Sequence, residues 1–458
     1  MTLPRDPITI EEIENRIRGG EVDTVVCAFP DHLGRLVGKR VTGSYFLDHV
    51  LTHPMHACAY LLTVDTEMTP LPGFELTSWE MGYGDFRMTP DLSTLRYAKW
   101  LDKTAILLCD VHNDETGDPV EEAPRNILRN QIEAAGEMGY ELYMASELEF
   151  YLFGENYRQV RAKGYQNLSP SSDYIIDYHI LATTYDEPVI RDIRNYLSAS
   201  GVPIEFSKGE WGHGQHEINI VYAPALEMAD RHVIYKNAVK EIAAHHEMSV
   251  SFMAKYSNDA AGNSCHIHTS LADKENKENA FWDADKNEPS QVFRWFLGGL
   301  LRAEKDLTLL FAPTINSYKR FEAGSFAPTA IAWSRDNRTC CLRTIGHAGS
   351  FRVENRMPGA DANPYLAFAA TIGAGLWGIK NQVDCGDPFK GDAYQSLELE
   401  RVPHSLEKAI EVFKESELAQ SIFSERVRKF LIQSAEHEVN FYNAAVTDWE
   451  KHRYFERI

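Results

Sequence analysis

The stretch ELYMASELEFYLF (141–153) sets two glutamates, Glu147 and Glu149, into a run of alternating and aromatic residues that is typical of a β-strand. Side chains two residues apart leave a strand on the same face, so both carboxylates should project together. Two like charges side by side on an otherwise aromatic strand are unfavourable unless a cation lies between them. A solvent-facing acidic pair is the competing interpretation, because acidic side chains are usually exposed. The pair can form a metal site only if further ligands lie close to it.

Further candidate ligands occur in three other short segments. They are Glu210 and Glu217 in GEWGHGQHEINI (209–220), His266 and His268 in SCHIHTS (264–270), and Glu354 in FRVENRMP (351–358). The two histidines are again two apart on one expected strand, although a histidine pair alone is more often structural than ligating. Together the five glutamates and a histidine form a set dominated by oxygen, which suits Mg²⁺ or Mn²⁺ better than structural zinc.

Arginines crowd the same part of the chain. The candidates, all within about forty residues, are Arg320, Arg338, Arg343, Arg352 and Arg356. Guanidinium groups match carboxylate and phosphate oxygens, and two of these arginines alternate with Glu354, which is unusual for a solvated face. Divalent metals with arginines indicate phosphoryl transfer, in which the protein positions groups and neutralises charge.

The common nucleotide-binding motifs are absent. GRLVGKR (34–40) resembles a phosphate-binding loop, but it is one residue short and lacks the Ser or Thr after the lysine. GHGQHE (212–217) lacks the third glycine of the dinucleotide fingerprint. Any ATP site must therefore have a different design.

Composition sets the broad class. The chain has 458 residues, enough for two or three domains, and its net charge of −21 argues against sequence-independent binding of nucleic acid. Seven scattered cysteines and a polar N-terminal stretch, MTLPRDPITIEEIENRI (1–17), favour a reducing, cytoplasmic setting. The most apolar stretch, YLAFAATIGAGLWGI (365–379), is too short for a membrane span and predicts a packed core helix, so we expect no membrane partner.

The order of predicted elements indicates an α+β protein. An initial helix (9–20) precedes β-rich runs at 22–30, 34–43 and 104–111, and a helix at 121–140 leads into the glutamate strand. Further β runs are expected at 217–224, 251–257, 264–271 and 350–358, and helices should fill the last fifty residues.

These segments, in this order, resemble glutamine synthetase over almost the whole chain. The motifs that carry the resemblance are ELEFYLF (147–153), GHGQHEINI (212–220), GNSCHIHTSL (262–271), NSYKR (316–320), NRTCCLR (337–343) and RVENRMPGADANPYLAFAA (352–370). The resemblance implies a small N-terminal β-grasp domain (1–112) and a large catalytic domain (113–458) with a curved antiparallel sheet and surrounding helices. It also implies a homo-oligomer, a double-ring dodecamer with active sites shared between neighbours, that uses ATP to form γ-glutamyl phosphate.

The resemblance assigns roles residue by residue. Glu149, Glu210 and Glu217 should hold the metal nearer glutamate, and Glu147, His266 and Glu354 the metal at the ATP phosphates. Glutamate should bind Arg320, Arg356 and the backbone near Gly262, with His266 beside them, and the nucleotide end should include His268, Ser270 and Arg352. Arg338 and Arg343 should stabilise the transferring phosphoryl group.

One loop departs from the family pattern. The family usually reads VPGYEAP where residues 322–328 read EAGSFAP, so Phe326 replaces the glutamate that closes over ammonium. The family's D-G-S-S segment, whose aspartate takes the amine proton, is also missing: LPGFELTSWEMGYGD (71–85) contains Ser78 and Trp79 instead. An aromatic wall of Phe326 and Trp79 favours an amine with an apolar body, because each buried methylene contributes about 0.8 kcal/mol.

The segment DHLGRLVGKRV (31–41) is similar to the γ-glutamyl-amine ligases of this family. We therefore predict a ligase that joins glutamate to an organic primary amine, with a small alkylamine favoured and ethanolamine, aniline or a polyamine still open. Glu80 and Asp85 are candidates for the group that removes the amine proton, and Glu322 or Glu80 would acidify the pocket if either turned inward. Glutamine synthetase itself and a non-catalytic relative are the alternatives. Tyr394 falls near a tyrosine that ammonia-using enzymes adenylylate, but its flanking residues differ.

Overall fold

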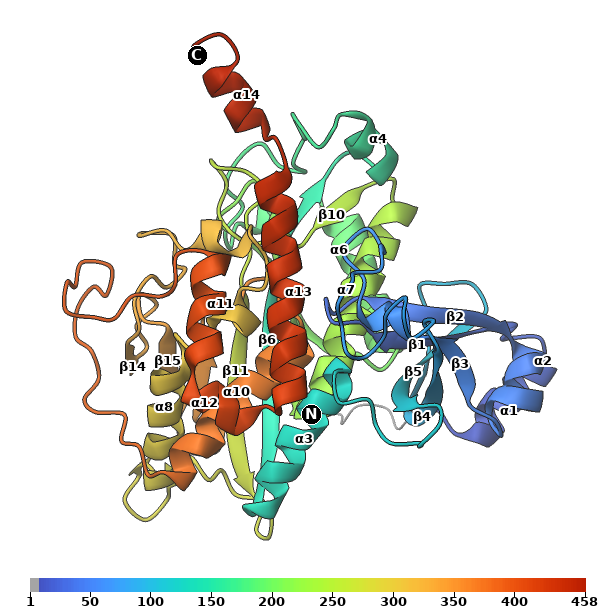
Figure 1. Cartoon of the computed structure of the whole chain (residues 1–458), viewed down its shortest axis with the longest axis horizontal. Coiled ribbons are helices and arrows are strands. Elements are labelled where there is room, and N and C mark those ends of the chain that lie inside the picture. Colours follow the sequence, from blue (N-terminus) through green and yellow to red (C-terminus); the bar gives the residue numbers. More distant parts are fainter. Residues whose placement is uncertain (1–7) are drawn as a thin grey trace.

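The computed structural model describes residues 8–458, so the first seven residues of the polar N-terminal stretch lie outside the described part. A five-stranded sheet occupies the N-terminal quarter, at the right of Figure 1. Its strands, in the order β2-β1-β5-β4-β3, are β2 (Leu36–Thr42), β1 (Thr24–Pro30), β5 (Thr104–Asn113), β4 (Asp85–Tyr97) and β3 (Met55–Cys58). β1 and β5 run parallel and the other neighbours antiparallel. Helix α1 (Ile10–Arg18) buries Ile13 in the core of this sheet.

The second sheet has nine strands and forms the centre of the larger part of the molecule. Its main path is β14 (Trp333–Arg335), β15 (Leu342–Ile345), β16 (Arg352–Asn355), β11 (Cys265–Asp273), β6 (Tyr140–Phe153), β8 (Gln215–Ile220) and β7 (Ile204–Gly209). β9 (Ala223–Pro224) and β10 (Ser249–Ser251) also pair with β6. All these pairings are antiparallel except that of β14 with β15. We propose that the change between the two sheets, after residue 112, is the domain boundary.

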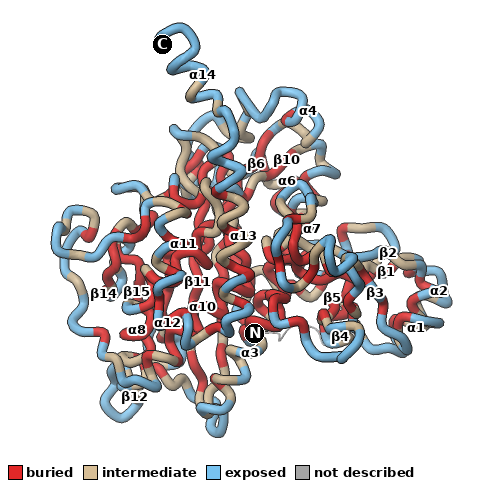
Figure 2. Tube along the Cα trace, viewed as in Figure 1, coloured by how far each residue is buried: buried red, intermediate tan, exposed pale blue. Residues whose placement is uncertain are grey.

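Helices pack around the large sheet. α3 (Pro124–Glu137) and α7 (Ala225–His245) contact β6, and α10 (Pro364–Lys380) packs against α3, α7 and α8 (Gln291–Ala303). α10 is buried along almost its whole length, as predicted for residues 365–379, because it lies among other helices (Figure 2). Four more helices end the chain: α11 (Leu406–Glu415), α12 (Glu417–Ile422), α13 (Glu425–Ala444) and α14 (Asp448–Tyr454). Among residues 8–458, no helix is both long and apolar enough to span a bilayer.

One strand prediction is wrong. The run 251–257 was expected to be β, but β10 ends at Ser251 and the chain then follows an irregular path. Side chains from elsewhere hold this path: Asn316 accepts from the Lys255 amide at 2.9 Å, and Asn263 donates to the Met253 carbonyl at 2.8 Å. Polar side chains thus replace the ladder bonds that a strand would make.

A buried ion network joins the small sheet to two helices of the larger part, α3 and α7. Arg125, at the start of α3, pairs with Asp230 of α7 at 2.9 Å and with Asp91 of β4 at 2.6 Å, and it also contacts Asp110 of β5. The tip of the β1–β2 hairpin is held in the same way, since the Asn363 side chain donates to the carbonyls of Asp31 and His32. The small sheet is therefore joined to the helices around the large sheet by charged and polar contacts, and by apolar packing as well, since Ile106 and Leu108 of β5 belong to the large hydrophobic core.

Candidate active site

Strand register places the predicted ligands in rows across one face of the large sheet. Glu147 of β6 lies directly opposite His266 of β11. Two residues further along β6, Glu149 lies opposite Glu217 of β8, and Glu217 lies opposite Lys208 of β7. Because side chains two apart share a face, these rows lie side by side. The predicted glutamate strand is confirmed.

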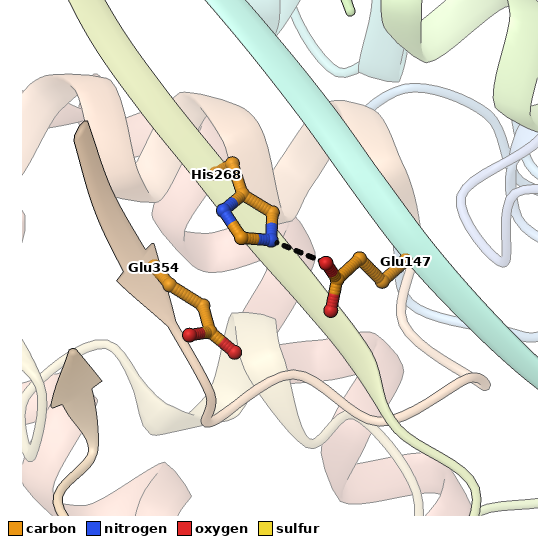
Figure 3. A group of neighbouring side chains, drawn as sticks. All are labelled: Glu147, His268 and Glu354. Carbon is orange, nitrogen blue, oxygen red and sulfur yellow. Dashed lines mark ion pairs between the residues drawn. The ribbon is translucent and has the colours of Figure 1, made fainter. Parts of the chain in front are cut away.

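A third row forms the other end of this face. Glu354 of β16 is opposite His268 of β11 on one side and Arg343 of β15 on the other. Figure 3 shows Glu147, His268 and Glu354 turned toward a common point, where they offer ligand atoms within 4.8 Å of one another. His266 belongs to the same cluster, since its Nδ1 lies 3.3 Å from Glu147 and 3.4 Å from Glu354.

Hydrogen bonding distinguishes the two histidines. Arg352 donates from Nε to Nδ1 of His268 at 3.1 Å, so a neutral His268 carries its proton on Nε2, the nitrogen 2.9 Å from Glu147. A protonated nitrogen donates and cannot bind a metal. His266 instead turns Nδ1 toward both carboxylates. This geometry favours His266 as the metal ligand and His268 as a donor, the division that the family resemblance implies.

Arginines neutralise this first cluster. The fully buried Glu354 carboxylate is paired with Arg343 at 2.8 Å and with Arg356 at 2.5 Å. Burial alone would raise the pKa of Glu354, but the charges of His266 and Arg356 lower it to about 2. Burial also opposes ionisation of Glu147, yet the adjacent His268 and His266 lower its pKa well below the ordinary value. Both carboxylates are therefore ionised and already partnered.

The second cluster consists of three carboxylates, one of which, Glu210, also contacts Lys208. Glu149, Glu210 and Glu217 offer oxygens within 4.8 Å of one another. Burial, followed by the charge of Glu210, raises the pKa of Glu149 to about 8. Burial and the charges of Glu147, Glu210 and Glu149 raise the pKa of Glu217 to about 10. Three mutually repelling carboxylates provide the oxygen ligands that Mg²⁺ and Mn²⁺ prefer, and a divalent cation would relieve the repulsion, so this donor set fits such an ion.

Two buried arginines retain free donors beside these clusters. The Nη atoms of Arg320 donate to the carbonyls of Met357 and Arg356, but the buried Nε of Arg320 has no hydrogen-bond partner among residues 8–458. Within the same residues, the buried Nε of Arg356 has none either. Gly262 packs directly on Arg320, since a Cβ at this position would lie 2.7 Å from Arg320 Cγ. Unpaired buried N–H groups are unfavourable in isolation, so this corner fits an anionic ligand such as a carboxylate.

The loop with Phe326 lies next to this corner. Phe326 has a φ of +61°, unusual for an aromatic residue, and its side chain is 55% exposed. The Phe326 carbonyl accepts from Arg356 Nη2 at 3.3 Å, which ties the loop to the arginine corner. Glu322 pairs with Lys255 at 2.9 Å, so its carboxylate is already engaged. Backbone contacts thus fix the loop, and the aromatic ring is presented to solvent.

The remaining predicted residues are placed as follows. Arg338 is 54% exposed and its nearest ion-pair partner is Asp336, at 4.0 Å. Ser270 lies on the same face of β11 as the two histidines. Trp79 is 76% exposed and packs on Tyr83, in the connection between β3 and β4. Glu80 of the same connection and Asp85 at the start of β4 are exposed as well. These contacts do not bring Trp79 to the clusters of its own chain. Tyr394 is half-buried and its hydroxyl donates to the Ala327 carbonyl at 3.1 Å.

Sequence reasoning missed two residues of the site. Lys208 contacts Glu210 within the carboxylate cluster, and Asp336 pairs with Arg343 at 2.5 Å. The signal for Lys208 was present, because it stands two residues before Glu210 at the end of a short β run. Asp336 follows β14 in a tight connection, at a φ of +51°, and no periodic pattern marks it.

Comparison with known proteins identifies the family. Residues 121–454 match the family described as glutamine synthetase, catalytic domain. The chain belongs to the glutamine synthetase family. It is 46% identical over 452 residues to the gamma-glutamylethanolamide synthetase of Streptomyces coelicolor, covering 99% of this chain and 96% of that protein. It is 37% identical to the glutamate–isopropylamine ligase of a Pseudomonas species, covering 98% of each.

Solved structures agree with this placement. A structure described as the GmaS/ADP complex has a TM-score of 0.84 and 28% identity, covering 97% of this chain and 99% of that one. The predicted α+β glutamine synthetase fold is thereby confirmed. Because relatives with other substrates share the fold, the site must decide which nitrogen donor this glutamine synthetase homologue uses.

Proposed function

We propose that this protein is an ATP-dependent glutamate–amine ligase that acts on a small organic primary amine with an apolar body. The observation that carries the choice of amine is Phe326, an aromatic side chain where the family pattern has a glutamate. A small hydrated cation such as ammonium suits an anionic pocket, whereas an aromatic wall favours a carbon chain. The names of the two similar ligases, for ethanolamide and isopropylamine, agree with this proposal.

The reaction proceeds in two balanced steps. An oxygen of the glutamate γ-carboxylate first attacks the terminal phosphorus of ATP, and the bond to ADP breaks. The amine nitrogen then attacks the carbonyl carbon of the γ-glutamyl phosphate, the bond from that carbon to the phosphate oxygen breaks, and the amine gives up a proton. The products are a γ-glutamylamide, ADP and phosphate, and such a ligase would serve amine catabolism or detoxification.

The residues of this chain divide the work. Arg320 and Arg356, with free Nε donors, would hold the carboxylates of glutamate. Arg343 and Arg338 would stabilise the charge on the transferring phosphoryl group, and His268 with Arg352 would donate at the nucleotide end. Magnesium or manganese, held by the carboxylate cluster and by Glu147, His266 and Glu354, would neutralise phosphate charge and polarise the reacting oxygens.

The family resemblance extends the proposal to assembly. Trp79 is exposed, and its ring contact is with Tyr83 and not with the carboxylate clusters of its own chain. We therefore propose that Trp79 completes the active site of a neighbouring copy. Glu80 or Asp85 would accept the amine proton there. A homo-oligomer, the double-ring dodecamer of the resemblance, would supply that neighbour. We propose a cytoplasmic location.

The test is phosphate release from ATP with glutamate and Mg²⁺ or Mn²⁺ across a panel of amines: ammonium, methylamine, isopropylamine, ethanolamine, aniline and putrescine. We expect strong turnover with one organic amine and little with ammonium. Phe326→Glu should lower the ratio of organic-amine turnover to ammonium turnover by about tenfold or more, because it returns an anionic group to the loop. Phe326→Tyr, which keeps the ring, is the matched control. Ammonium as the best substrate of the native protein would make it a glutamine synthetase in activity.

A further inference from the structure

A lysine with two acidic neighbours marks the edge of the large sheet beside the carboxylate cluster. Lys208 Nζ contacts Glu210, lies 3.4 Å from Asp177 Oδ1 and 3.3 Å from the Gly209 carbonyl, and sits 4.3 Å from the centre of the Tyr178 ring. Its side chain is 14% exposed and that of Asp177 is 30% exposed. Both side chains are therefore partly accessible to solvent.

The position of this group follows from the order of strands. Arg343, Glu354 and the histidines lie on β15, β16 and β11, whereas Glu217 and Lys208 lie on β8 and β7 at the far edge. If phosphate is transferred at the arginine-rich end, we expect the nucleophile to approach from the other end, next to Glu210. This argument rests on the proposed ligase function.

The chemistry of this edge differs from that of an ammonium site. A fixed ammonium group on Lys208 lowers the negative charge beside Glu210 and repels a second cation. Tyr178, which is 71% exposed, supplies aromatic surface next to Lys208. A neutral hydroxyl meets the remaining requirements if it replaces the long 3.4 Å contact between Lys208 and Asp177, because it then accepts from Lys208 while it donates to Asp177.

We propose that Lys208 and Asp177 are specificity-determining residues that bind a hydroxyl group at the far end of the amine, so that the preferred nucleophile is a short amino alcohol. The proposal separates three molecules of nearly equal shape. Ethanolamine ends in a hydroxyl, n-propylamine in a methyl group and 1,2-diaminoethane in a cation. A site that hydrogen-bonds a hydroxyl discriminates strongly against analogues that lack it, since its own polar groups are then left unpaired.

The experiment measures kcat/KM for these three amines, by phosphate release and by mass of the γ-glutamyl product. The native protein should prefer ethanolamine to n-propylamine by about tenfold or more, with 1,2-diaminoethane last. Lys208→Met should remove the hydroxyl preference and improve the diamine relative to n-propylamine, and Lys208→Arg should keep the native order. Lys163→Met, at a surface ion pair with Glu155, is the matched control for loss of one lysine.

Asp177→Asn provides a second variant, because Lys208 contacts the carboxylate cluster and its replacement can impair folding. It should lower the ethanolamine to n-propylamine ratio several-fold, chiefly through KM for ethanolamine. Equal use of ethanolamine and n-propylamine by the native protein would overturn the proposal and leave the ligase function intact. An unchanged ratio in both variants would overturn it as well. Absence of turnover with every amine would instead contradict the proposed function.

Discussion

The two acidic clusters of this protein share one sheet face but are balanced in opposite ways. Around Glu354, two arginines and two histidines surround the carboxylates, and the pKa of Glu354 falls to about 2. Around Glu217, the neighbours are mainly other carboxylates, and its pKa rises to about 10. In the first cluster two arginines of the chain pair with Glu354, whereas in the second the one lysine, Lys208, pairs with Glu210 and leaves the charges of Glu149 and Glu217 to be balanced by protons or by a bound cation.

This difference explains why both clusters can belong to one reaction. A pre-neutralised cluster can accept a metal that arrives with the negative charge of ATP, because the arginines offset that charge. A cluster with three acids and one lysine instead favours a bare divalent ion and would hold it beside an uncharged nucleophile. The comparison makes the electrostatic environment, more than the ligand type, the feature that separates the two sites.

The largest expected effect comes from replacing one glutamate in each cluster by glutamine and comparing the two variants. Glu354→Gln leaves Arg343 and Arg356 without their buried partner, and it should lower the free energy of unfolding by about 3–5 kcal/mol. Glu217→Gln removes a carboxyl that must take up a proton on folding near pH 8, so the metal-free protein should be unchanged or more stable at that pH. Both variants should lose activity. Thermal unfolding in EDTA measures the contrast, and equal destabilisation would contradict it.

Two arginines of the phosphoryl end should separate catalysis from stability. Arg338→Ala should reduce kcat by about 10²–10³-fold, as for loss of one preorganised donor, while the free energy of unfolding changes by less than about 0.5 kcal/mol. Arg343→Ala should lower both kcat and the free energy of unfolding, because the Arg343 side chain is mostly buried and paired with Glu354. Arg335→Ala, an exposed arginine on β14, is the control. Full activity in Arg338→Ala would remove Arg338 from the mechanism.

The pH dependence of the metal-free protein should follow the carboxylate cluster. In the folded state Glu149 and Glu217 keep their protons to about pH 8 and 10, whereas in the unfolded chain they lose them near the ordinary value of 4.5. Between these limits the folded state binds more protons, so stability falls as pH rises, by at most ~1.4 kcal/mol per pH unit for each carboxyl. Unfolding in EDTA at several pH values checks this slope, which Glu217→Gln should reduce.

Metal binding gives the same linkage with the opposite sign. Because a ligating carboxylate must be deprotonated, Mn²⁺ should release protons near pH 7 and bind more tightly as pH rises. Calorimetry in buffers of different ionisation enthalpy counts these protons. Binding without proton release would show that the cluster is already ionised.

The sequence predicted the architecture well where periodicity and motif agree. The alternation around Glu147 and Glu149 predicted β6, and the apolar run at 365–379 predicted α10. The prediction for residues 251–257 was wrong, because Asn316 and Asn263 hold that path from a distance and no local pattern reveals them.

Much of the candidate site was also accessible from the sequence, because its ligands lie two residues apart on strands. The relation between strands was not accessible. Only register pairs Glu217 with both Glu149 and Lys208, and only the folded chain puts Arg352 on His268 and so separates the two histidines. The difference in charge between the two clusters depends on these contacts across strands, so no single segment of the sequence could predict it.

The central claim is that this site joins glutamate to an organic amine in preference to ammonia. One reaction tests it directly: ATP, glutamate and Mg²⁺ with equal concentrations of ammonium, isopropylamine and ethanolamine in the same tube, and all products counted by mass spectrometry. We expect γ-glutamylamides of the organic amines to exceed glutamine by a wide margin. An excess of glutamine would contradict the claim and return this protein to the ammonia-using members of its family.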